Sequence, residues 1–163
     1  MRKVTPAGLV STLTANGALG PGFQPASATG AALKYITADA AGNVYVSDYI
    51  QANADAVSYT IYKITPAGAV KAVITGLNTA SDGLIAIDAA GNLFVDFKAL
   101  VPQQPGHVYI TSLPGTAADG FLGFGFTATG WADITGIGFD GSNNLYISDA
   151  GPVNYEIVKF SVQ

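Results

Sequence analysis

The sequence predicts an all-β fold, and three observations support this prediction. The chain has 163 residues, of which 49% are hydrophobic, as expected of a folded domain with a substantial core. Its 20 glycines and 8 prolines indicate frequent turns, and only 11% of its residues are charged, too few for the Glu- and Lys-rich faces of surface helices. Two sequence patterns also recur along the chain. Disorder is therefore excluded, and short strands joined by turns are expected.

The first repeated pattern is Asp-Ala-Ala-Gly-Asn followed by a short apolar run. It occurs within residues 36–48 and 85–96, and a related version, Asp-Gly-Ser-Asn-Asn, occurs within residues 138–149. Asp and Asn side chains can bond to nearby backbone, and Gly tolerates positive φ, so each segment predicts the turn of a hairpin. The runs that follow, such as residues 44–46, are continuously apolar, which is typical of strands covered on both faces.

The second repeated pattern interleaves with the first. Lys-Val-Thr-Pro-Ala-Gly at residues 3–8 recurs as Lys-Ile-Thr-Pro-Ala-Gly at residues 63–68, and an apolar stretch follows each copy. Pro presets φ and Gly closes the turn, here between a third strand at residues 61–65 and a fourth at residues 70–74. Four antiparallel strands in about 50 residues predict one blade of a β-propeller.

This arrangement resembles the NHL repeat, in which an apolar strand, Asp-x-x-Gly-Asn, a strand ending in Asp, Lys-Ile-Thr-Pro-x-Gly and a last strand follow one another. Residues 35–76 match a complete blade, and residues 84–126 match it in the first two strands and more loosely afterwards. Partial blades are expected at residues 1–14, with the third and fourth strands, and at residues 135–163, with three strands. Residues 1–163 are thus interpreted as one propeller domain of about three blades.

About three blades make half of a ring, because NHL-like propellers usually carry about six. An open ring exposes apolar blade faces and unpaired strand edges, which proteins normally cover. The C-terminal blade lacks a fourth strand, and residues 9–14 form a fourth strand without a blade. We therefore expect two chains to complete a six-bladed homodimer through blade edges. The alternatives are a fragment of a longer propeller or irregular stacking, and residues 3–5 and 155–162 both correspond to a third strand.

Candidate binding residues lie in three segments between the second and third strands of successive blades, at residues 49–55, 97–104 and 150–154. We expect these loops to share one rim, and binding residues concentrate on loops that a rigid scaffold positions. An alternative is that the segments are ordinary connections without a ligand. The candidate contact residues are Tyr49, Asn53, Phe97, Lys98, Gln103, Gln104 and Asn154.

Three carboxylates, Asp48, Asp96 and Asp149, end the second strand of successive blades. They could ring one face of the propeller and hold a divalent metal or a polar ligand, as the resemblance to gluconolactonase-like propellers implies. Because the pattern repeats in every blade, a structural role in accepting backbone N–H bonds is favoured instead. We therefore expect no catalytic residue and no cofactor or metal.

Several function classes are excluded by what the sequence lacks. There is no cysteine, so disulfides, thiolate catalysis and Cys-ligated metals are excluded, and one histidine, His107, is too few for the zinc site of a propeller amidating lyase. A net charge of -4 without a basic stripe excludes nucleic acid and anionic membranes as partners. No apolar run reaches the ~18 residues of a membrane helix, and no signal peptide is visible.

The first hypothesis for function is therefore a non-enzymatic propeller module whose rim loops bind a protein, a peptide or a glycan. The second is a lactonase- or lyase-like enzyme with a site on the ring axis, assembled across subunits. The third is a purely structural, self-assembling propeller unit. The composition, poor in charge and rich in Ala, Gly, Thr and Asn, resembles that of secreted or cell-envelope propellers of bacteria.

Overall fold

The protein is built of antiparallel β-strands joined by turns. The computed structural model describes residues 2–12, 32–53, 56–77, 83–97, 107–111, 134–150 and 155–161. Within these ranges, 12 strands form four separate antiparallel sheets, and the prediction of an all-β fold is confirmed. No described segment forms a helix that is long and apolar enough to cross a membrane.

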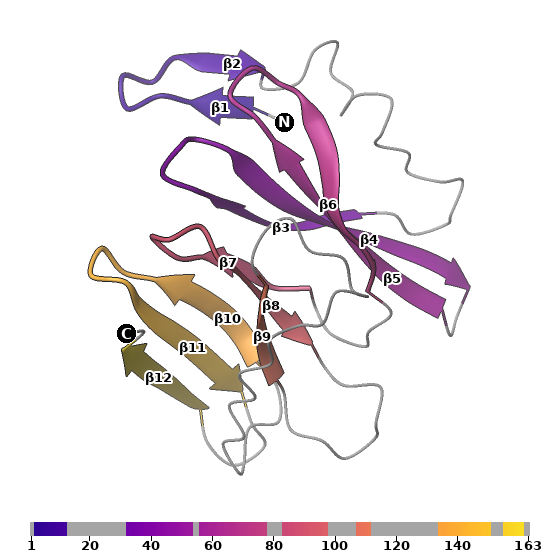
Figure 1. The fold of residues 1–163 in the computed structure, drawn as a ribbon, viewed down its shortest axis with the longest axis vertical. Helices are drawn as coiled ribbons and strands as arrows, with labels where there is room; N and C mark the ends of the chain where they lie inside the picture. The colour runs from indigo at the N-terminus through magenta and orange to yellow at the C-terminus, as the bar shows by residue number, and fades with distance from the viewer. Residues whose placement is uncertain are drawn as a thin grey trace.

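One sheet has four strands, in the order β3-β4-β5-β6. Its strands, purple to magenta in Figure 1, are β3 (Ala32–Ala38), β4 (Val44–Asn53), β5 (Ala56–Ile64) and β6 (Val70–Leu77). β4 is longer than expected, because residues 49–53, predicted as loop, continue the strand and pair with β5. Aromatic packing across the strands explains the extension, since Tyr49 pairs with Tyr59 and their ring centroids lie 5.4 Å apart.

Two three-stranded sheets and a hairpin make up the rest of the described chain. One three-stranded sheet consists of β7 (Ile85–Ile87), β8 (Leu93–Phe97) and β9 (His107–Thr111). The other consists of β10 (Ile134–Phe139), β11 (Asn144–Ala150) and β12 (Tyr155–Ser161). The hairpin consists of β1 (Arg2–Val4) and β2 (Val10–Thr12). β1 and β2 are thus the two strands expected at the N-terminus, and β10, β11 and β12 are the three strands expected at the C-terminus. The fourth strand expected after β9, before residue 126, falls outside the described residues.

The Asp-x-x-Gly-Asn segments form hairpin turns, as predicted. In the first turn the backbone N–H and the side-chain amide of Asn43 donate to the two carboxylate oxygens of Asp39, at 2.8 and 2.7 Å. The same two bonds recur between Asn92 and Asp88 and between Asn144 and Asp140. These three turn carboxylates therefore have a structural role, because each fixes the start of the second strand of its sheet.

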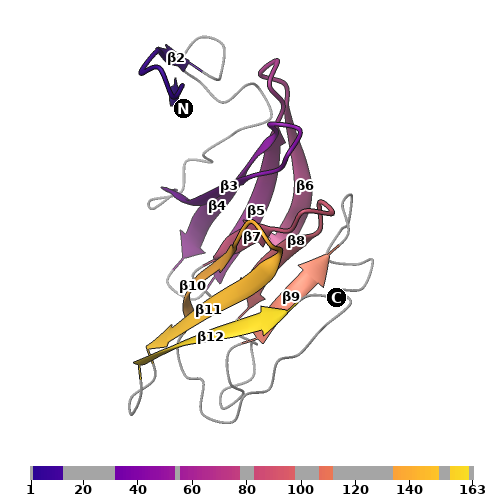
Figure 2. The same cartoon turned by 90° about the vertical axis from the view of Figure 1, so that its left-hand side faces the viewer.

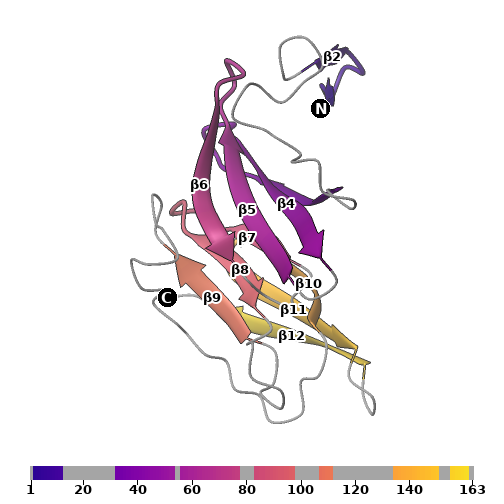
Figure 3. The same ribbon diagram turned by 90° about the vertical axis from the view of Figure 1, so that its right-hand side faces the viewer.

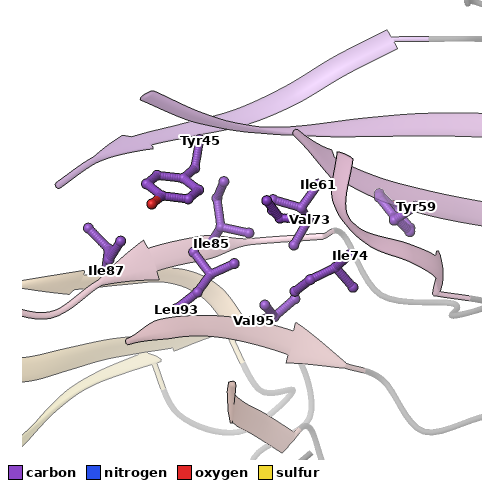
Figure 4. Close-up of a cluster of buried hydrophobic side chains, with 9 residues drawn as sticks. All are labelled: Tyr45, Tyr59, Ile61, Val73, Ile74, Ile85, Ile87, Leu93 and Val95. Atoms are coloured by element: carbon purple, nitrogen blue, oxygen red, sulfur yellow. The ribbon is translucent and has the colours of Figure 1, made fainter. Parts of the chain in front are cut away.

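The three larger sheets stack face to face in chain order (Figures 2 and 3). β7 lies between β3 and β10 and contacts both strands. At the first junction, side chains of the four-stranded sheet pack on those of β7 and β8 (Figure 4). This cluster contains Tyr45, Tyr59, Ile61, Val73 and Ile74 on one side and Ile85, Ile87, Leu93 and Val95 on the other.

The second junction joins the β7–β9 sheet to the β10–β12 sheet. Phe94 of β8 is buried there against Leu145 and Ile147 of β11. Its neighbours in the chain, Leu93 and Val95, point to the first junction, because successive residues of a strand face opposite sides. The continuous apolar run of this strand therefore reflects cover on both faces, as the sequence predicted.

Replacing Gly83 with alanine is expected to destabilise the protein by about 2 to 5 kcal/mol. Gly83, which precedes β7, has a φ of +73°, and a Cβ there would lie 2.5 Å from Cε1 of the buried Tyr59. The left-handed backbone costs about 1 to 2 kcal/mol for a non-glycine residue, and overpacking costs a further 1 to 3 kcal/mol, roughly. Urea denaturation measures the loss.

Gly8→Ala is the matched control for this prediction. Gly8 has nearly the same φ, +78°, and nothing lies within 4 Å of an added Cβ. The control therefore carries the backbone cost without the clash. Equal losses of stability in the two variants would show that the Tyr59 ring moves aside at no cost.

Candidate functional site

The candidate rim residues are only partly within the described chain. Tyr49, Asn53 and Phe97 lie in strands β4 and β8, and the side chains of Asn53 and Phe97 are not described. The prediction of a loop at residues 49–55 is therefore wrong for residues 49–53, which extend strand β4, and residues 54–55 lie outside the described residues. The remaining candidates lie outside the described residues: Lys98, Gln103, Gln104 and Asn154.

The ends of the second strands nevertheless gather on one side of the stack. In Figure 1, β4, β8 and β11 run in the same general direction, away from the turns that precede them. The C-terminal ends of these three strands therefore lie on the side opposite the Asp-x-x-Gly-Asn turns. This arrangement is what a shared rim requires.

Tyr49 is held in place near this end of β4. Its ring makes an edge contact with Tyr59, and Nζ of Lys34 lies 5.2 Å from the centroid of the Tyr49 ring. A cation over an aromatic face is attracted to it by about 0.5 to 1 kcal/mol at exposed sites. Tyr49 is thus a partly buried, oriented aromatic side chain and not a loop residue.

The three carboxylates that end the second strands do not share one register position. Asp48 and Asp149 each stand five residues after the Asn of their turn, whereas Asp96 stands four residues after Asn92. Asp96 therefore corresponds in register to Ser47, and Phe97 corresponds to Asp48. Of the three carboxylates, only Asp48 and Asp149 therefore occupy equivalent register positions, and both are buried.

Asp48 is a buried carboxyl with an unpaired oxygen. It is 1% exposed, and its Oδ2 has no hydrogen-bond partner among the described residues. Burial disfavours the charged form and raises the pKa of Asp48 to about 6. Burial, together with the Asp48 charge, also raises the pKa of the nearby Tyr62 hydroxyl. Unpaired buried polar groups are rare, so Asp48 is the described side chain whose environment most needs an explanation.

A repeated Asp-Tyr-Lys group accompanies the turns, and it was not among the sites expected from the sequence patterns. The Tyr45 hydroxyl donates to Oδ2 of Asp39 at 3.1 Å, and Nζ of Lys63 lies 5.6 Å from the Tyr45 ring centroid. Burial opposes ionisation of Asp39, but bonds from Asn43 and Tyr45 outweigh it and lower the pKa of Asp39. Burial raises the pKa of Tyr45.

The same group recurs in the last sheet. The Tyr146 hydroxyl donates to Oδ2 of Asp140 at 3.1 Å, and Nζ of Lys159 lies 5.7 Å from the Tyr146 ring centroid. The backbone and side-chain bonds from Asn144 lower the pKa of Asp140 to about 2. The sequence signal was present, because Tyr follows Asp by six residues in both copies. The lysine becomes recognisable only once the register pairs it with that tyrosine.

The described residues contain no group of three or more His, Cys, Asp or Glu side chains that could hold a metal ion. No protein-family model matches the chain, and no curated protein matches it. The functional interpretation therefore depends on the contacts, burial and charge of the residues themselves.

Proposed function

We propose that the chain is a non-enzymatic interaction module of the NHL propeller type, in which the stacked sheets act as blades. One observation carries the proposal: three sheets follow one another face to face, with the turns on one side and the C-terminal ends of the second strands on the other. Such a scaffold holds the connections side by side, where they can contact one ligand.

The rim formed by these connections binds a protein, a peptide or a glycan. Tyr49 offers an oriented ring for stacking, and Gln103 and Gln104 add amide groups that donate and accept hydrogen bonds. The interpretation as an interaction module, rather than an inert scaffold, follows from this combination.

Binding is tested by probing the protein on peptide and glycan arrays and comparing it with a rim variant. Joint replacement of Lys98, Gln103 and Gln104 by alanine is expected to weaken binding to the array hits by about tenfold or more, equivalent to about 1.4 kcal/mol or more. Lys71→Ala, at an exposed position of β6, is the control and is expected to bind as the unmodified protein does. Unchanged affinity in the rim variant would contradict the proposal.

A second copy of the chain completes the ring. The stacked sheets supply half of a propeller of about six blades, and a two-fold pair of half-rings closes without leaving an open end. Light scattering at micromolar concentration is expected to give twice the chain mass of 16.6 kDa. A compact monomer would contradict this part of the proposal.

A second candidate function, a lactonase- or lyase-like enzyme, is favoured by Asp48. A buried carboxyl with a pKa of about 6 exchanges protons near neutral pH and suits general acid-base chemistry. Assays of lactone opening, with and without added divalent metal, test this function. Turnover that is present in the unmodified protein, absent in Asp48→Asn and retained in Asp140→Asn would replace the first proposal with this one.

A further inference from the structure

The β10–β12 sheet exposes a face whose counterpart in the four-stranded sheet is buried. In the four-stranded sheet, this face packs against the β7–β9 sheet. The residues at the same register positions in β11 and β12 have nearly the same chemistry, and we call them the C-terminal face. Tyr45, Tyr59, Ile61 and Lys63 of the covered face correspond to Tyr146, Tyr155, Ile157 and Lys159 of the C-terminal face.

The two copies differ in their cover. Tyr59 and Ile61 are 3% and 0% exposed beneath the β7–β9 sheet, whereas Tyr155 and Ile157 are 88% and 75% exposed. Large apolar side chains in a contiguous exposed patch mark an interaction site on a soluble protein. In the four-stranded sheet, the equivalent side chains pack against the face of a neighbouring sheet, so a sheet face is the kind of partner that fits them.

The other end of the stack carries a partly exposed copy of the complementary face. Ile85 of β7, which packs into the first junction, is 5% exposed, and it stands three residues before Asp88. Ile36 of β3 stands three residues before Asp39 and is 61% exposed. Its neighbours by register on the same side of the four-stranded sheet complete what we call the N-terminal face. The N-terminal face comprises Leu33 and Ile36, which are 44% and 61% exposed, and beside them Val46 and Asp48, which are each 1% exposed.

We infer that the C-terminal face of one chain binds the N-terminal face of a second copy, which repeats between chains the junction seen within the chain. The exposed apolar side chains available for this contact are Tyr155 and Ile157 on one face and Leu33 and Ile36 on the other. Apolar burial at Tyr155 and Ile157 supplies the main driving force. The inference rests on the proposed propeller and names the surfaces that close its ring.

A second copy is required, because one chain cannot bring its own two faces together. The four-stranded sheet and the β10–β12 sheet lie at opposite ends of the stack, with the β7–β9 sheet between them (Figures 1 and 3). Two copies related by a two-fold axis form the same junction twice, once with each pair of faces. The assembly therefore ends at a dimer.

The first experiment places a charge on the C-terminal face. Ile157→Glu is expected to raise the dimer dissociation constant at least 100-fold, measured by sedimentation velocity over a concentration series. The side chain is exposed within the chain, so the variant is expected to keep the thermal unfolding transition of the isolated monomer. Ala67→Glu, in an exposed turn outside both faces, is the control and is expected to dimerise normally.

The outcomes separate three cases. A dimer that Ile157→Glu does not weaken would overturn the inference and leave the proposed dimer standing. If Leu9→Glu, on the exposed hairpin, disrupts that dimer instead, the strands pair through blade edges. A monomeric unmodified protein would overturn the proposed ring completion itself, together with the inference.

The second experiment tests whether the C-terminal face of one copy contacts the N-terminal face of the other. The chain contains no cysteine, so Ile36→Cys and Ile157→Cys each introduce a single thiol. A short bis-maleimide is expected to give a covalent dimer in the mixture of the two variants and in neither variant alone. Cross-linking of Ile157→Cys to itself would indicate contact between like faces and would overturn the inference, as would the absence of product in the mixture.

Discussion

Replacing Asp48 with asparagine is expected to remove most of the decrease in stability that the protein shows as the pH rises from about 4 to about 8. The pKa of this buried carboxyl is raised from 3.8 to about 6, because burial disfavours its charged form. One pKa unit corresponds to about 1.4 kcal/mol, so ionised Asp48 lowers the free energy of unfolding by about 3 kcal/mol. The neutral amide has no charge to desolvate.

The direction of the effect follows from proton binding. Between pH 3.8 and about 6 the folded chain holds a proton on Asp48 that the unfolded chain has released, so stability falls as the pH rises through this window and stays low above it. The advantage of Asp48→Asn over the unmodified protein is thus expected to grow by about 3 kcal/mol from acid to neutral pH, as measured by urea denaturation at several pH values. Parallel curves for the two proteins would contradict this account.

Asp140→Asn is the control of opposite sign. The pKa of Asp140 is lowered to about 2 by hydrogen bonds from Asn144, so its ionised form stabilises the turn above about pH 4, and this contribution is lost as the pH falls through 2. The control is therefore expected to be less stable than the unmodified protein at neutral pH. Asp48→Asn is expected to be more stable there.

Local patterns were sufficient to predict the hairpin turns and most strands. Each Asp-x-x-Gly-Asn turn is fixed by bonds within five residues, as at Asp39 and Asn43, so the sequence alone determines it. The extension of β4 through residues 49–53 could not be predicted in this way, because it depends on Tyr59 in the next strand. Polar residues such as Gln51 and Asn53 made this segment resemble a loop.

The candidate site was harder to predict, because its chemistry depends on register and burial. Asp48 and Asp96 look equivalent in the sequence, but Asp48 stands five residues after the Asn of its turn and Asp96 stands four, so they do not share a register position. The unpaired Oδ2 of Asp48 becomes visible only when three-dimensional packing excludes other partners. Similarly, the exposure of Ile157 contrasts with the burial of Ile61 only after the sheets are stacked.

Phe94→Ala is expected to destabilise the protein by about 3 to 5 kcal/mol, the usual cost of truncating a buried phenylalanine. Phe94 is 1% exposed at the junction between the β7–β9 and β10–β12 sheets, and its ring makes an edge contact with Phe139 at 4.7 Å between centroids. Because the cavity would open between sheets, the β10–β12 sheet is expected to lose protection against hydrogen exchange before the four-stranded sheet does.

The contribution of the aromatic pair can be separated from that of apolar volume. Phe94→Leu keeps most of the buried volume without the ring, so it is expected to cost less than half as much as Phe94→Ala. A double-mutant cycle with Phe139→Leu is expected to give a coupling energy of about 0.5 to 1.5 kcal/mol for the edge contact. If Phe94→Ala lowered protection equally in all sheets, the stack would unfold as a single cooperative unit, and the junction would not be a boundary between separately stable sheets.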